Sequence, residues 1–252
     1  MEVHHHAHTE RKKWTHYFWE FLMLFLAVFC GFLAEYQLEH KIEKDREKQF
    51  MKSLLTDLQK DSMLLSYSIR VGPRIVQASE SLLAELQIEP LKGKEKKIYQ
   101  YLSLLSEGIT FRYYDRTVSQ LRNSGGFRLV SKHNVSDAIL DYDVLMREAV
   151  NYATSIESWS FITPGIVRSA SIFNIDLVFK IYDDARKYTV PDSINFPGDV
   201  TFMSYDKKDI KEFINLQRVA QLTDAAKLDY SERAFRLNRG LDSLIRKEYR
   251  LR

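Results

Sequence analysis

The residue types that most often carry chemistry are sparse beyond position 34. Only two histidines follow that point, and the single cysteine, Cys30, precedes it. Cysteine nucleophiles and zinc sites built from cysteine and histidine are therefore excluded from residues 35–252. A Ser-His-Asp arrangement would depend on His133, whose neighbours Ser131 and Asp137 have the pattern of turn and helix-cap residues.

Two pairs of neighbouring carboxylates could serve acid–base chemistry or bind a cation, namely Asp141 with Asp143 and Asp183 with Asp184. Neither pair has the loop spacing of a calcium site, so we interpret them as exposed helix residues. No set of nucleophile, base and orienting group assembles around them. We therefore expect no enzyme activity and assign no catalytic, cofactor-binding or metal-binding residue.

Paired glycines follow a polar stretch at Asn123-Ser124-Gly125-Gly126. Such glycines can cradle a phosphate, but no strand is expected before them, and no Lys-Ser or Lys-Thr follows. We therefore predict a structural turn. A helix ends near Asn123, and Gly125 or Gly126 takes the left-handed conformation that closes a helix C-terminus.

The N-terminal tail carries His4, His5, His6 and His8. Neutral imidazoles bind zinc, copper or nickel, so one interpretation is a metal-binding tract. The alternative is a flexible, weakly basic tail without the packed surroundings that orient metal ligands. We favour the second interpretation and expect no metal.

An apolar run from Tyr17 to Ala34 holds one charged residue, Glu20, and no proline. At about 1.5 Å per residue, a helix of this length nearly crosses a hydrocarbon core about 30 Å thick. Aromatic residues that favour the membrane–water interface lie at both ends, including Trp14 and Tyr36. We predict a single transmembrane helix over residues 17–34.

A cleaved signal peptide is the competing interpretation, because a basic cluster at residues 11–13 precedes the run. Residues 32–34 lack the small-x-small pattern that signal peptidase accepts, and the bulky Phe29 before Cys30 disfavours lipoprotein cleavage. We therefore expect the helix to be retained.

One face of the predicted span carries Glu20, Ala27, Gly31 and Ala34. Small residues four apart let another helix approach closely in lipid, and a carboxyl group there prefers protein contacts. This face therefore predicts packing against a second copy or a partner's membrane helix. The alternative is that Glu20 reaches the interface near His16 and that the small residues are incidental.

Residues 35–52 predict a highly charged helical stalk. Glutamates recur every four residues from Glu35 to Glu47, beside a second stripe that runs from His40 to Lys52. A parallel bundle would let the acidic stripe of one copy face the basic stripe of its neighbour. The alternative, which we favour, is a solvated stalk that holds the next domain clear of the lipid.

Residues 53–252 have the apolar periodicity of several helices. Gly72-Pro73 should interrupt the first of them, since proline removes an amide donor. Asn134 should cap a later helix, and residues 189–199 should form a loop. The branched and aromatic residues at 172–182 allow a short strand, but without an evident partner strand we predict a buried helix there. A final helix is expected from Lys207 to about Tyr249. With short connections, this pattern predicts an antiparallel helical bundle.

Three segments resemble a known family. They are YFWEFLMLFLAVFCGFLAE (Tyr17–Glu35), REKQFMKSLLTDL (Arg46–Leu58) and QLRNSGGFRLV (Gln120–Val130). With the His-rich tail, they are similar to a family of uncharacterised, single-span, mostly helical proteins from Bacteroidetes bacteria. The resemblance covers the first half of the chain well and the remainder loosely. It implies a cell-envelope protein with an all-α build, and it brings no known activity or site residues.

The expected organisation is a cytoplasmic tail (1–16), a transmembrane helix (17–34), a charged stalk (35–52) and a helical bundle domain (53–252). Positive charge directly before a span tends to stay in the cytoplasm, and long C-terminal domains cross membranes readily. We therefore expect the bacterial inner membrane as location, with the main domain in the periplasm.

The expected function is binding. We expect a scaffold or accessory subunit of envelope components, whose partners are the lipid bilayer and either further copies or a partner membrane protein. The competing hypothesis is a sensor that relays ligand binding through the stalk. A pocket with convergent polar groups favours sensing, and an exposed apolar patch favours scaffolding. A net charge of +3 is too small to predict nucleic-acid binding.

Overall fold

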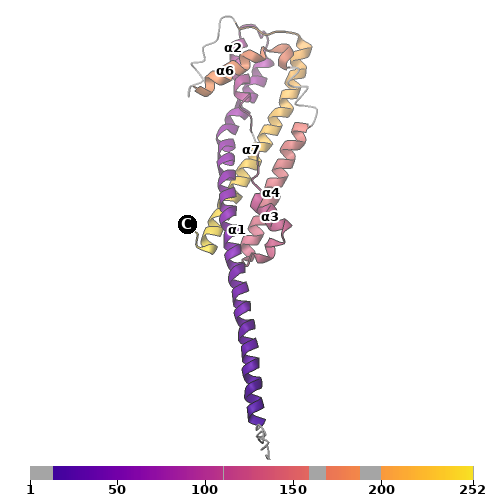
Figure 1. The fold of residues 1–252 in the computed structure, drawn as a ribbon. Helices are drawn as coiled ribbons and strands as arrows, with labels where there is room; N and C mark the ends of the chain where they lie inside the picture. Colours follow the sequence, from indigo (N-terminus) through magenta and orange to yellow (C-terminus); the bar gives the residue numbers. More distant parts are fainter. Residues whose placement is uncertain (1–13, 110, 159–168, 188–199, 252) are drawn as a thin grey trace, which may run out of the picture. The chain divides into compact units, whose positions relative to one another are not determined.

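The computed structural model describes residues 14–109, 111–158, 169–187 and 200–251, and it describes only the backbone of 156–158 and 182–187. The regular structure of these residues is helical throughout, which confirms the all-α prediction. The elements are α1 (Trp14–Leu86), α2 (Glu95–Leu105), α3 (Arg116–Asn123), the 3₁₀ helix η1 (Gly126–Leu129), α4 (His133–Ser158), α6 (Ile175–Lys187) and α7 (Lys207–Tyr249) (Figure 1). The chain divides into two compact units between Gln49 and Phe50, and α1 extends through both.

The N-terminal part of α1 has the length and composition of a membrane span. Its most apolar 18-residue window has a mean hydropathy of 2.0, and none of that window is buried. Large side chains such as Leu24 and Val28 are 70% and 74% exposed. A continuous apolar surface of this kind is costly in water and compatible with lipid.

The prediction that Gly72-Pro73 interrupts the helix is wrong, because α1 continues through Pro73. Gly72 is buried, and a Cβ atom at that position would lie 2.8 Å from Cδ1 of Leu228. The glycine therefore allows α7 to pack closely on α1. Burial of the neighbouring Val71 and Ile75 outweighs the hydrogen bond that proline cannot make.

The larger core of the second unit lies where α1, α3, α4 and α7 meet. Its buried side chains are Met51, Leu54, Leu55, Leu58, Leu65, Val118, Leu121, Val130, Val135, Ile139, Tyr142, Leu145, Met146, Ala234, Leu241 and Ile245. On each helix these residues recur at spacings of three and four, as burial of one helical face requires.

Helices α4 and α7 lie side by side and run in opposite directions (Figure 1). Three contacts define their alignment: Asn134 with Glu248 at 3.4 Å, Tyr142 with Asn238 at 3.2 Å, and the rings of Tyr152 and Tyr230 at 5.5 Å. Because α4 begins at His133, Asn134 lies inside the helix, and the prediction that it is the cap was wrong.

A second core joins α2, α6 and the first turns of α7. Tyr99 is central to it: the ring makes edge contacts with Phe173 and Phe202, and the hydroxyl accepts from the Asn174 N–H at 2.7 Å. α6 overlaps the segment 172–182 for which a buried helix is predicted. The predicted loop at 189–199 lies outside the described residues.

The last helix has its predicted bounds, and its ends have identifiable caps. The Asp206 carboxylate accepts from the N–H groups of Lys208 and Asp209 at 2.9 and 3.0 Å, as an N-cap residue does. At the other end, Arg250 adopts a left-handed conformation, with φ of 49°.

Replacement of Pro73 by alanine should stabilise the protein. The side chain is exposed, so little packing is lost, and the new N–H can bond to the Ile69 carbonyl. We expect the free energy of unfolding to rise by about 1–3 kcal/mol in a urea titration followed by circular dichroism in mild detergent. Arg74→Ala, at the exposed neighbour, is the control and should change it by less than about 0.5 kcal/mol. A loss of stability in Pro73→Ala would contradict the expectation.

Candidate functional site

Three aspartates, Asp57, Asp61 and Asp143, are almost completely inaccessible to solvent. A buried carboxylate is costly unless it is paired or accepts hydrogen bonds, so each of them needs partners. The partners come from α3, from the segment before α3, and from α4.

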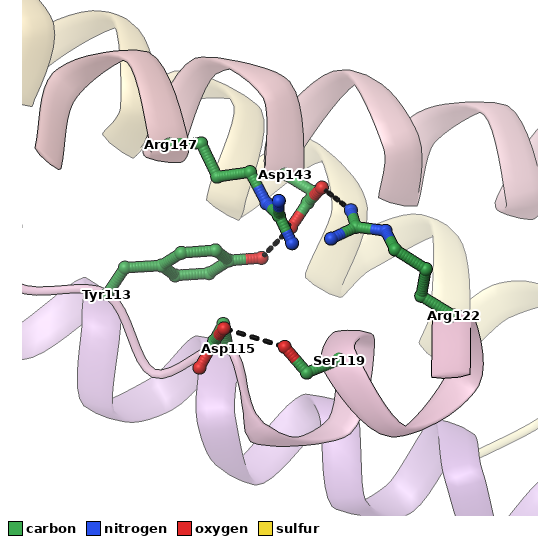
Figure 2. A network of polar contacts seen from close by, with 6 residues as sticks. All are labelled: Tyr113, Asp115, Ser119, Arg122, Asp143 and Arg147. Carbon is green, nitrogen blue, oxygen red and sulfur yellow. Dashed lines mark hydrogen bonds and ion pairs between the residues drawn. The ribbon is translucent and has the colours of Figure 1, made fainter. Parts of the chain in front are cut away.

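Asp143 on α4 is the centre of the cluster in Figure 2. It forms ion pairs with Arg122 of α3 and with Arg147, one turn further along α4, at 3.2 Å. The Tyr113 hydroxyl donates to the same carboxylate at 2.9 Å. Asp115 lies nearby and accepts from the Ser119 hydroxyl at 2.7 Å. The interpretation of Asp143 as an exposed helix residue was therefore wrong, whereas Asp141 is exposed.

Asp57 and Asp61 lie one turn apart on α1. Asp57 accepts from the backbone N–H and the hydroxyl of Thr117, at 3.1 and 2.5 Å. Asp61 accepts from the Tyr114 N–H and the Tyr142 hydroxyl, both at 2.9 Å. These bonds fasten the start of α3 and the middle of α4 to α1.

Asn238 extends the same network to α7. Its amide donates to the Tyr142 hydroxyl at 3.2 Å and to the Leu58 carbonyl at 2.9 Å. The aspartates thus accept hydrogen bonds from the chain itself, and the arrangement links α1, α3, α4 and α7. The network is therefore structural, because the carboxylates that could act as acceptors already accept hydrogen bonds from the protein.

Burial has a measurable consequence for Asp61. Desolvation raises the pKa of its carboxyl from 3.8 to about 6, against the opposing effect of the hydrogen bonds from Tyr114 and Tyr142. The nearby charges of Asp57 and Asp115 raise the pKa further. Burial also raises the pKa of the Tyr142 hydroxyl, which therefore stays protonated and acts as a donor at neutral pH.

A surface groove of about 480 Å³ lies between α4 and α7, and we call it the α4–α7 groove. It is lined by Asp141, Val144, Leu145, Glu148, Arg233, Arg236 and Leu237. Val144 and Leu237 are 54% and 40% exposed. The two acidic side chains come from α4 and the two basic ones from α7, so the edges of the groove carry opposite charges.

A cavity of about 400 Å³ lies among α2, α6 and α7, and we call it the α2–α6–α7 cavity. Most of its wall is apolar and includes Leu102, Phe173 and Phe213. Two charged side chains one turn apart on α7, Asp224 and Lys227, also line it. Cavities of this size and character are where proteins usually bind small molecules.

The predicted packing face of the span lies entirely in the first unit. The Glu20 carboxylate lies 3.0 Å from the His16 ring nitrogen Nε2, a contact consistent with the interfacial alternative. Ala27, Gly31 and Ala34 are exposed, and a Cβ on Gly31 would have open space around it. Packing of this face against another helix stays a prediction.

The predicted turn residues lie between α3 and η1. Asn123 is the last residue of α3, and the Ser124 N–H bonds to the Gln120 carbonyl at 3.0 Å. Gly125 has a φ of 64°, which is the left-handed region. Gly126 is buried against Leu121, whose Cα would lie 3.2 Å from an added Cβ. Residues 123–126 therefore form the turn in which α3 ends and η1 begins.

Other candidate residues are separated. His133 is exposed at the start of α4, as are Ser131 and Asp137. The His-rich tail lies outside the described residues, and so do the side chains of Asp183 and Asp184. Among the residues that are described, no group of three or more metal-ligating side chains comes together.

The buried network was not predicted from the sequence, although one signal was available. Leu54, Leu58 and Leu65 define the buried stripe of α1, and Asp61 occupies the place in that stripe between the last two. A carboxylate on an apolar stripe indicates a buried charge that needs partners.

Comparison of the chain with family models, with curated proteins and with solved structures finds no match. The resemblance to the Bacteroidetes family therefore stays a prediction.

The raised pKa of Asp61 predicts an unusual pH dependence of stability. Because the folded state binds a proton more tightly than the unfolded state, its contribution is fully present below pH 3.8 and is lost as the pH rises through about 6. On going from pH 7.5 to 4.5, the wild-type protein should gain about 2 kcal/mol relative to Asp61→Asn. Urea titrations of both proteins at the two pH values measure this, and a constant difference would contradict the assignment.

Removal of the Asp143 carboxylate should be costly, because Tyr113, Arg122 and Arg147 lose their common acceptor. Both arginines are partly exposed and can turn to water, so we expect Asp143→Ala to lower the free energy of unfolding by about 2–4 kcal/mol. The exposed Asp141→Ala, two residues earlier, should change it by less than about 0.5 kcal/mol. Equal effects of the two substitutions would show that the network does not stabilise the fold.

Proposed function

We propose that the protein is a membrane-anchored scaffold or accessory subunit whose helical domain binds other components of the bacterial envelope. In this proposal α1 holds the chain in the inner membrane, with the N-terminus cytoplasmic, a charged stalk over residues 35–52 and a periplasmic helical bundle domain. The observation that carries the proposal is the α4–α7 groove, because an apolar floor between charged edges is the usual composition of a protein interface.

The occupant that best fits the groove is a second copy of the chain. The α4 edge of the groove carries Asp141 and Glu148, and the α7 edge of the groove carries Arg233 and Arg236. A two-fold axis parallel to these helices would bring the α4 edge of one copy opposite the α7 edge of the other. Each acidic row would then face a basic row, and Val144 and Leu237 would be covered at the centre.

The span offers a second surface for the same association. Glu20, Ala27, Gly31 and Ala34 share one face of a helix that is exposed along its apolar window. In lipid, small residues four apart favour close packing of two helices. Copies that meet through the α4–α7 groove could also meet here, or a partner's membrane helix could occupy this face.

Binding fits the buried carboxylates better than catalysis does. A general acid or base must reach a substrate, whereas Asp57, Asp61 and Asp143 are buried and accept hydrogen bonds from Thr117, Tyr142 and Tyr113. We therefore propose that the protein is not an enzyme.

A charge reversal tests the proposed pairing of copies. Glu148→Arg and Arg236→Glu should each convert a dimer to a monomer, because like charges would face each other across the interface. The double variant restores opposite charges and should recover the dimer. Light scattering after gel filtration of the full chain in mild detergent measures the mass.

A matched control is Leu222→Asp, which alters a 71% exposed residue of α7 that does not line the groove. This variant should keep the wild-type mass. A wild-type protein that elutes alone as a monomer, or single variants that remain dimeric, would remove the main support for self-association through the groove.

A second candidate function is a single-span sensor, in which ligand binding in the helical domain is relayed through the stalk. The α2–α6–α7 cavity favours it, because apolar walls surround convergent polar groups there. The relay requires two states of α1, and a change of crosslinking between copies at Cys30 on addition of ligand would support it.

A further inference from the structure

The α2–α6–α7 cavity contains an acidic side chain on an otherwise largely apolar wall. One face of α7 contributes Phe213, Gln217, Ala220, Asp224 and Lys227, at spacings of three and four residues. Side chains of α2 and α6, such as Leu102 and Val178, form the opposite wall. The volume of about 400 Å³ is within the range of sites that hold small organic molecules.

The aromatic part of the wall has a defined arrangement. The ring of Phe173 lies 5.1 Å from that of Phe213, and the two rings meet edge to face. Phe173 and Phe213 are buried, whereas Phe179 is 56% exposed although it also lines the cavity. A ligand with an apolar body would cover Phe179 and remove its surface from water.

Asp224 is the half-buried acidic group in this wall. No hydrogen bond from the described part of the chain reaches its carboxyl group, whereas the Gln217 amide donates to Ser79 at 3.0 Å. Desolvation raises the pKa of Asp224, and the charge of Lys227 opposes that shift. An ammonium group on a ligand would supply a charge-assisted hydrogen bond to this half-buried carboxylate.

Lys227 is the other charged group in the wall. It is 91% buried, as its relative exposure is 9%, and it already has an interaction within the protein. The carboxylate of Asp224 is therefore the charged group in the wall that accepts no hydrogen bond from the described residues, although the charge of Lys227 acts on it.

We propose that the α2–α6–α7 cavity binds small amphipathic amines, whose apolar body lies against Phe173, Phe179 and Phe213 and whose ammonium group donates to the Asp224 carboxylate. This inference names the ligand of the sensor described above and rests on the cavity alone. It requires neither the relay nor the pairing of copies through the α4–α7 groove.

The test uses the full chain in phosphatidylcholine nanodiscs, with dansylcadaverine as probe, since it joins an aromatic body to a primary amine. Its fluorescence in nanodiscs without protein is subtracted. We expect saturable binding at one site per chain. Octylamine should displace the probe at a concentration at least tenfold below that needed with octanol or octanoate, on the scale of one charge-assisted hydrogen bond.

Three variants locate the site. Asp224→Asn keeps the shape but removes the charge, and it should weaken binding about tenfold or more. Asp229→Asn, at a well-exposed acid that pairs with Arg233 on the same helix, should bind as the wild type does. Ala220→Trp adds an indole at an exposed position of the lining and should abolish binding. Circular dichroism and gel filtration check that each variant is folded and unchanged in mass.

Several results would overturn the proposal. They are the absence of saturable binding, equal displacement by octylamine and octanol, and unchanged affinity in Asp224→Asn. Displacement by octanoate in preference to octylamine would also overturn it and assign the site to anions held by Lys227. Amine binding by a protein that is monomeric in detergent would support the cavity and contradict self-association through the α4–α7 groove, so the two proposals fail separately.

Discussion

The arrangement of the helical domain depends on how the chain compensates buried carboxylates. Asp57 and Asp61 point from α1 into the core, where an unpaired charge costs several kcal/mol. The compensating donors include the N–H groups of Tyr114 and Thr117, which are fixed parts of the backbone. Once these bonds form, the start of α3 has only one register against α1. The hydrogen bond from Tyr142 to Asp61 fixes α4 against α1 in the same way, and the bond from Asn238 to Tyr142 fixes α7 against α4.

Helix α4 has two faces with different roles. Tyr142, Asp143 and Met146 point inward and are held by the core and by the polar network. Asp141, Val144 and Glu148 point outward and line the α4–α7 groove. Because the inward face has little freedom, the outward face is presented on a rigid support, which lowers the entropic cost of binding a partner. α7 combines the same two roles, and along its first half it also lines the α2–α6–α7 cavity.

The sequence was informative wherever one periodicity dominated. Apolar spacing predicted the all-α fold, the bounds of α7 and the apolar N-terminal part of α1. It failed where tertiary contacts outweighed local preference: α1 continues through Pro73 because the flanking residues are buried, and Gly72 fits against Leu228. Asp143 was interpreted as exposed because its partner Arg122 lies on another helix. The groove and the cavity could not be predicted, since each combines residues from helices whose pairing no local pattern specifies.

The division of the apolar interior into separate clusters affects how the domain loses structure. One large cluster contains residues of α3 and α4, a second contains residues of α2 and α6, and only α1 and α7 contribute to both; a small third cluster consists of Val71, Ile75 and Ile109. We therefore expect either of the two large clusters to lose structure locally before the other does. A molecule that fills the cavity would raise the opening free energy of the α2–α6 cluster directly. The opening free energy of the α3–α4 cluster would rise only to the extent that α1 and α7, which both clusters share, couple the two.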